Sequence, residues 1–184
     1  MWESPISASL VASSKINFGD LAIDGNDIYW TETNPDENGR SVIVRHRENA
    51  PIKIINRAPY DVKSRVHEYG GGSFCAYNGT VFFSNFTDQK IYRVKETNKD
   101  PEPITSNSDN TRYADYFFDN SRKNLIGIRE THSESGSIEN CIVAIDTEGR
   151  QKEKILAVGA DFYSSPRLSP DAKFLAWIQW NHPN

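Results

Sequence analysis

Three residues with chemically active side chains stand directly before a glycine run in His67-Glu68-Tyr69-Gly70-Gly71-Gly72. A carboxylate can receive a charged amino group, and a histidine beside it can help to position that group. Three consecutive glycines let the backbone pass close to a ligand or to another chain. Glu68 is therefore the candidate acceptor of such a group. Its neighbours His67, Tyr69 and Arg65 are further candidate binding residues.

The same segment also has a purely structural interpretation, which the sequence leaves open. It can be a loop that enters a strand, with His67 and Tyr69 buried and hydrogen-bonded and the glycines forming a bulge. Arg65 can pair with Glu68 and contribute only to stability.

Nucleophilic and metal chemistry find little support in the sequence. A serine nucleophile elbow needs the pattern G-x-S-x-G, and no serine satisfies it. Ser73 comes nearest, but Cys75 stands where the second glycine is required. The other histidines, His46, His132 and His182, form no His-x-His or His-x-x-x-His pair. We therefore expect no catalytic residue, no metal and no cofactor in this chain.

The composition excludes several other classes of function. The chain has 21 basic and 25 acidic residues, so its net charge of −4 offers no basic surface for nucleic acid. No signal peptide and no run of eighteen apolar residues occurs, so we expect no membrane association. Cys75 and Cys141 form no C-x-x-C motif and are expected to be reduced, buried thiols in a cytoplasmic protein.

A repeat organises the chain around these residues. Four segments share a strand, a turn rich in Asp, Asn and Gly, and an apolar strand. Trp30, Phe83, Ile128 and Trp177 occupy matching positions, at spacings of 53, 45 and 49 residues. Such periods are typical of four-stranded propeller blades. Aromatic residues at strand positions are expected in the core between blades: Trp30, Phe82, Phe83, Phe117, Phe118, Trp177 and Trp180.

The sequence therefore predicts an all-β chain, because no segment has a helical period and many segments alternate. We expect a partial β-propeller of about three and a half four-stranded antiparallel blades within residues 1–184. The expected blades cover about 17–56, 73–106 and 113–157, followed by a half blade at 162–184. An unclosed ring leaves edge strands and apolar faces open, so self-association is expected.

Two strings resemble a known family. One is the segment Arg65–Phe74, which contains His-Glu-Tyr-Gly-Gly-Gly, and the other runs from Asp161 to Trp-Asn-His-Pro-Asn at 180–184. Both resemble the N-terminal β-propeller of the prolyl oligopeptidase family, in its acylaminoacyl-peptidase and dipeptidyl-aminopeptidase branch. The resemblance covers nearly the whole chain. It departs at Ala172, where the family hairpin usually has glycine.

The resemblance implies a hydrolase context. In that family the propeller precedes a C-terminal α/β-hydrolase domain with a Ser-Asp-His triad, covers the active site and limits access to short peptides. The chain stops before such a domain, so we expect it to be inactive alone. The resemblance also favours a substrate-binding role for His67 and Glu68.

Two alternatives remain. One is a propeller-type protein-binding or scaffold module without peptidase activity. The other is a propeller enzyme such as a lactonase or glycosidase, but no suitable set of metal ligands or paired carboxylates is evident.

Overall fold

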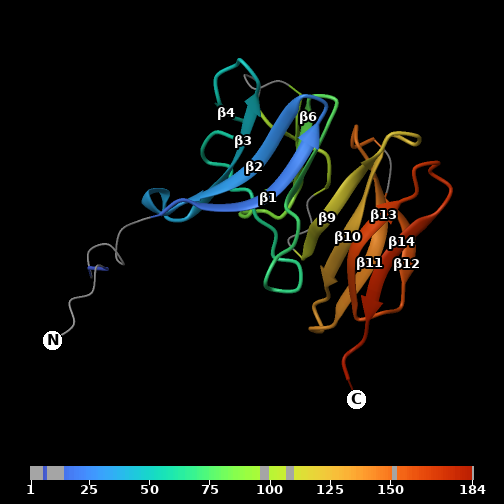
Figure 1. Cartoon of the computed structure of the whole chain (residues 1–184). Helices are drawn as coiled ribbons and strands as arrows, with labels where there is room; N and C mark the ends of the chain where they lie inside the picture. The colour runs from blue at the N-terminus through green and yellow to red at the C-terminus, as the bar shows by residue number, and fades with distance from the viewer. Residues whose placement is uncertain (1–5, 8–14, 96–99, 107–109, 151–152, 184) are drawn as a thin grey trace.

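The computed structural model describes residues 6–7, 15–95, 100–106, 110–150 and 153–183, and the rest of the expected 1–184 propeller lies outside them. Within these residues the chain forms fourteen β-strands and one short 3-10 helix, η1 (Pro35–Glu37). The strands belong to four antiparallel sheets, each in sequential order. The sheets lie side by side, with the earliest strands at one end and the last hairpin at the other (Figure 1).

Each sheet corresponds to one repeat and is called a blade below. Blade 1 contains β1 (Asn17–Asp24), β2 (Asp27–Asn34), β3 (Arg40–Arg47) and β4 (Lys53–Ile54). Blade 2 contains β5 (Phe74–Tyr77), β6 (Thr80–Ser84), β7 (Ile91–Val94) and β8 (Glu102–Pro103). Blade 3 contains β9 (Thr111–Asp119), β10 (Asn124–His132), β11 (Ile138–Asp146) and β12 (Lys154–Val158). Half blade 4 contains β13 (Phe162–Leu168) and β14 (Leu175–Trp180).

This arrangement confirms the predicted fold class, an all-β partial propeller with three four-stranded blades and a two-stranded half. The hairpin turns have the backbone that their residues suggest. Asn78 and Gly79 have φ values of 48° and 73°, as a type I′ turn requires. Ala172 has a φ of 56°, so an alanine occupies a left-handed position that favours the glycine seen in the family.

Alternation along the strands sends neighbouring side chains to different blade interfaces. Phe83 packs in the cluster between blades 1 and 2, whereas Phe82, one residue earlier, packs between blades 2 and 3. A third cluster, which includes Ile128 and Tyr163, joins blade 3 to half blade 4. Each interface of the described stack therefore has its own apolar core.

The prediction that all strand aromatics lie in the inter-blade core is partly wrong. Phe82 and Phe83 are buried, and Phe117 and Phe118 pack against the clusters from partly buried positions. Trp177 and Trp180, on β14, remain 38% and 41% exposed. Half blade 4 has a described neighbour on one side only, so no described strand covers these rings on its other side.

The first strands of successive blades lie next to one another: β1 beside β5, β5 beside β9, and β9 beside β13. Aspartates link them. The Asp20 carboxylate accepts hydrogen bonds from Ser73 N–H and Oγ at 2.9 and 3.0 Å. The Asp115 carboxylate accepts one from Ser165 N–H at 2.6 Å. β1, β9 and β13 each have a register shift near these aspartates or their partner.

Both cysteines are free thiols, and they lie at the same blade interface. Cys141 is fully buried in the cluster between blades 2 and 3, and Cys75 packs against that cluster. Burial raises the pKa of both thiols. No helix in the described ranges is long and apolar enough to cross a membrane.

Candidate functional site

The candidate residues form a turn rather than a bulge in a strand. The N–H of Glu68 donates to the carbonyl of Arg65 at 3.0 Å, and the N–H of Gly70 donates to the carbonyl of Val66 at 2.9 Å. His67 and Glu68 have φ values of 55° and 65°. Two consecutive left-handed residues that are not glycine need support from their surroundings. We call residues 66–70 the His67 turn.

Glu130 provides that support from blade 3. Its side chain is 2% exposed, and Oε2 accepts a hydrogen bond from the N–H of His67 at 2.7 Å. Oε1 receives Nη1 of Arg112 at 3.2 Å and lies 2.7 Å from Nε2 of His132. A buried carboxylate with charged and neutral partners on both oxygens is a rigid anchor. Glu130 therefore fixes the first residue of the turn.

Glu68 points away from this buried anchor. Its side chain is 72% exposed, and Oε1 accepts from Nη1 of Arg112 at 2.6 Å. The hydrogen bond and charge of Arg112 lower the pKa of the Glu68 carboxyl, so it is ionised at neutral pH. Oε2 of Glu68 accepts no hydrogen bond from the described residues. It remains available to a ligand that donates one.

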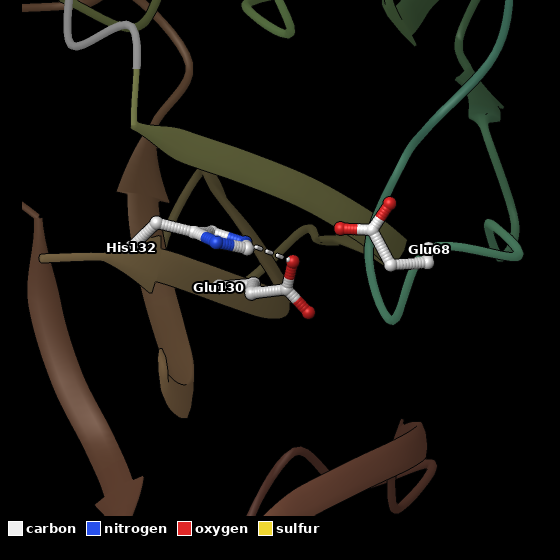
Figure 2. Close-up of side chains that lie close together, drawn as sticks. All are labelled: Glu68, Glu130 and His132. Carbon is white, nitrogen blue, oxygen red and sulfur yellow. Dashed lines mark hydrogen bonds and ion pairs between the residues drawn. The ribbon is translucent and has the colours of Figure 1, made fainter. Parts of the chain in front are cut away.

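Glu68, Glu130 and His132 offer donor atoms within 4.8 Å of one another, a spacing that a metal ion could use. Figure 2 shows Glu130 and His132 projecting together from β10 while Glu68 approaches from the loop. Arg112 donates to both glutamates from one nitrogen and so already supplies positive charge between them. The arrangement is better described as a salt-bridge network than as a metal centre.

His67 joins an aromatic group at the end of blade 4. Its ring centroid lies 5.1 Å from that of Phe162, 5.6 Å from Tyr69 and 6.3 Å from Trp180. Its Nδ1 is 3.4 Å from the Tyr69 hydroxyl, whereas Nε2 is buried, and the Asn140 side chain interacts with the ring. Burial lowers the pKa of His67, against the opposing charge of Glu130, so the ring is neutral at pH 7.

A cavity of about 150 Å³ lies against this turn. Its wall includes the rings of His67, Tyr69 and Trp180, and its apolar lining includes Ala114 and Ile128. The turn, blade 3 and half blade 4 all contribute to it. The cavity therefore lies where three separate parts of the sequence meet.

The structure brings together only some of the predicted binding residues. Arg65 does not pair with Glu68: its guanidinium lies 4.2 Å from the centre of the Phe86 ring, and Arg112 takes the glutamate. Tyr69 is 76% exposed, so the interpretation that buried it is wrong.

The glycine run lies close to the chain's own backbone and side chains. Gly70 has a φ of 87°, and a Cβ there would meet the Ser64 carbonyl oxygen at 3.0 Å. A Cβ on Gly71 would lie 3.1 Å from that of Ala114, and one on Gly72 would lie 3.4 Å from Asp115 Cα. The glycines therefore let the turn dock on blade 3.

Sequence reasoning missed Arg112, Glu130 and His132. A signal for them exists in the register of the β9–β10 hairpin, where Glu130 stands opposite Arg112. Glu130 and His132 are two apart on one strand, so they share a face. What could not be foreseen is that this face meets the His67 turn, 63 residues earlier than Glu130.

Ser73 has a structural environment. It is 6% exposed and its hydroxyl donates to Asp20 rather than to a histidine.

Known structures resemble the chain throughout. A puromycin-hydrolyzing peptidase of Mycobacterium tuberculosis is 36% identical, with a TM-score of 0.87 over 100% of this chain. A puromycin hydrolase is 28% identical over 99% of it, also at 0.87. The chain spans 30% of the length of each. A prolyl endopeptidase structure, 9% identical at a TM-score of 0.59, shares the fold.

No family model matches the chain, and no curated protein does. The relation to this family therefore depends on the solved structures. They indicate the same family as the two sequence strings do. Over its whole length, the chain resembles the N-terminal β-propeller of a prolyl oligopeptidase-family serine peptidase.

Proposed function

We propose that this chain is the substrate-admitting propeller segment of a serine peptidase that hydrolyses short peptides. The observation behind the proposal is the 36% identity, over the full chain, to a puromycin-hydrolyzing peptidase. That relative is more than three times as long, so the chemistry belongs to a further domain of the α/β-hydrolase type in this proposal. The chain itself has no G-x-S-x-G segment to supply a nucleophile.

Within this function, Glu68 receives the free amino terminus of the peptide. The geometry supports this role because Glu68 is ionised, exposed and held from behind by Arg112. Its second oxygen is open to a donor, and a charged donor such as an ammonium group bonds to a carboxylate more strongly than a neutral donor does. An exposed ion pair such as Arg112–Glu68 adds little stability, so sharing the carboxylate with a ligand costs little. His67 and Tyr69 flank the bound group.

Hydrolysis of aminoacyl- and acetyl-aminoacyl-p-nitroanilides tests this function. The 184-residue chain is compared with the longest protein that its gene encodes. We expect activity in the longer protein alone and a KM for free-amino substrates that rises about ten-fold in Glu68→Gln. Glu48→Gln, an exposed glutamate of blade 1, is the matched control and should change nothing. Activity in the 184-residue chain would contradict its assignment as non-catalytic.

A protein-binding role is a second candidate, because both ends of the described stack expose apolar side chains. Blade 1 exposes Leu21 and Ile23, and half blade 4 exposes Phe174 and Ile178. Either a partner protein or a second copy of the chain can cover such faces. We propose that, in the chain alone, a second copy of the chain covers these faces, so that the chain self-associates.

A further inference from the structure

We propose that a groove between blade 3 and half blade 4 binds a free alkyl carboxylate, that is, a medium-chain fatty acid. The groove has a volume of about 390 Å³, and none of its lining residues belongs to the His67 turn. A hollow of this size, mostly apolar and with a few polar groups, is typical of small-molecule sites. The proposal goes beyond the proposed function and does not depend on it. We call this hollow the blade 3–4 groove.

One wall of the blade 3–4 groove contains a row of three residues that are paired across blade 3. Ile126 on β10 stands opposite Ala144 on β11, and Ala144 stands opposite Lys154 on β12. All three line the groove. Two steps between neighbouring strands make this row about 10 Å long. The row therefore begins at an apolar side chain, passes a small side chain that leaves space, and ends at an ammonium group.

The other wall belongs to half blade 4 and is mainly apolar. Leu168 and Leu175 stand opposite each other across β13 and β14, and both line the groove together with Trp177. The side chains of Trp177 and, on the blade 3 side, Leu156 are each 38% exposed. An alkyl chain between the two walls would remove these side chains and its own methylene groups from water, which favours binding.

The charged residues of the lining favour an anion. Three are basic and one is acidic: Arg122, Lys154, Lys173 and Asp119. The Asp119 carboxylate already accepts from the guanidinium of Arg122 at 2.9 Å, so these two charges satisfy each other. Lys154 has no ion-pair partner among the residues that the structure describes. Lys173 has an exposed pair with Asp171 at 3.5 Å, which is a weak interaction, so both ammonium groups can turn to a carboxylate.

These features together specify a linear molecule with one anionic end. Its apolar chain lies over Ile126 and Ala144, and its carboxylate lies at Lys154. A cationic amphiphile would meet like charges at that end of the row. A small anion without an alkyl chain would leave the apolar walls uncovered, and a ligand charged along its length would lose hydration there without gaining a partner.

Calorimetric titration of the full chain, below the micelle concentration of each ligand, tests the site directly. The ligands are octanoate, hexanoate and octylamine. We expect octanoate to bind about ten-fold more tightly than hexanoate, because it buries two more methylene groups. Octylamine has the same chain length with the opposite charge, so it should bind at least about ten-fold more weakly than octanoate.

Two substitutions separate the charge of the site from its apolar space. Lys154→Gln should weaken octanoate about five-fold. Lys53→Gln is the matched control and should change nothing, because Lys53 is exposed on β4, the fourth strand of blade 1, as Lys154 is on β12 of blade 3. Ala144→Leu places a larger side chain in the middle of the row and should abolish the binding of octanoate and hexanoate alike. Urea unfolding of this variant checks that it is folded.

Three results would overturn the proposal. One is equal binding of octanoate and octylamine, and another is equal binding of octanoate to Lys154→Gln and Lys53→Gln. The third is an absence of octanoate binding, which would favour a protein segment, such as a second copy of the chain, as the occupant of the groove.

Discussion

Glu130 is the buried charge around which the candidate site is built. Its carboxylate bonds to the His67 N–H, Arg112 and His132. Glu130→Gln removes the charge that Arg112 faces. The amide nitrogen of glutamine also cannot accept a hydrogen bond, so one of the contacts of the carboxylate is lost. We expect a loss of about 2 kcal/mol in the free energy of unfolding, measured by urea denaturation.

The exposed Glu68 gives the comparison for this change. It bonds to the same arginine from the solvent side, so Glu68→Gln should lower the free energy of unfolding far less than Glu130→Gln does. Equal losses in the two variants would show that Glu130 is not the anchor.

His67 predicts a pH dependence of stability. Burial lowers its pKa from the ordinary value of 6.5, although the Glu130 carboxylate and Asn140 act in the opposite direction. The unfolded chain therefore binds more protons than the folded chain as the pH falls below about 6.5, and the folded state loses stability there. The stability that the neutral His67 contributes is complete above that pH.

The variant His67→Asn isolates this contribution. Asparagine tolerates the left-handed φ of 55°, so the turn can remain. Urea midpoints at about pH 7.5 and 5.5 should differ less in the variant than in the unmodified chain. Parallel losses in both proteins would assign the pH dependence to carboxylates elsewhere.

At the scale of elements, the β9–β10 hairpin depends on Gly127. A Cβ there would lie 2.5 Å from Tyr116 Cβ and 2.9 Å from Tyr116 Cα, opposite the irregularity that contains Asp115. Because backbone must move, we expect Gly127→Ala to destabilise the chain by about 3 kcal/mol in urea unfolding.

Gly136 is the control for this prediction. It has a φ of 84° with no atom within 4 Å of an added Cβ, so Gly136→Ala meets only backbone strain, about 1 kcal/mol. A milder effect at Gly127 than at Gly136 would mean that the irregularity in the hairpin adapts easily.

The elements were largely predictable from sequence, and the reasons are local. Asn78-Gly79 determines its own turn, and alternation at Phe82 and Phe83 determines which blade each side chain faces. For the candidate site, the sequence indicated only the residues of the His67 turn. His67 and Glu68 stand out beside their glycines, but Glu130 becomes a partner only through the docking of separate blades. No spacing along the chain records that contact.

At the scale of the whole molecule, both ends of the described stack expose apolar side chains. Ile23 stands opposite Ile28 across β1 and β2, Leu21 lies two residues before Ile23 on the same strand, and all three are exposed. At the other end, Ile178 is 59% exposed on β14. Light scattering of the chain should therefore show a mass that falls on dilution. Leu21→Lys and Ile178→Lys should each move the mass toward the monomer.

Ile138→Lys is the matched substitution, at a residue that is 55% exposed at the start of β11. It should leave the mass unchanged because it lies on an inner blade of the described stack. A dilute, stable monomer of the unmodified chain would contradict the prediction.

The placement of the two cysteines makes thiol labelling a measure of local opening in this chain. Cys141 is fully buried in the cluster between blades 2 and 3, Cys75 packs against that cluster from a partly buried position, and burial raises the pKa of both thiols. Alkylating reagents attack the thiolate and need access to it. Labelling of Cys141 therefore requires the interface between blades 2 and 3 to open, and its rate reports how often that opening occurs in the native chain without any engineered probe.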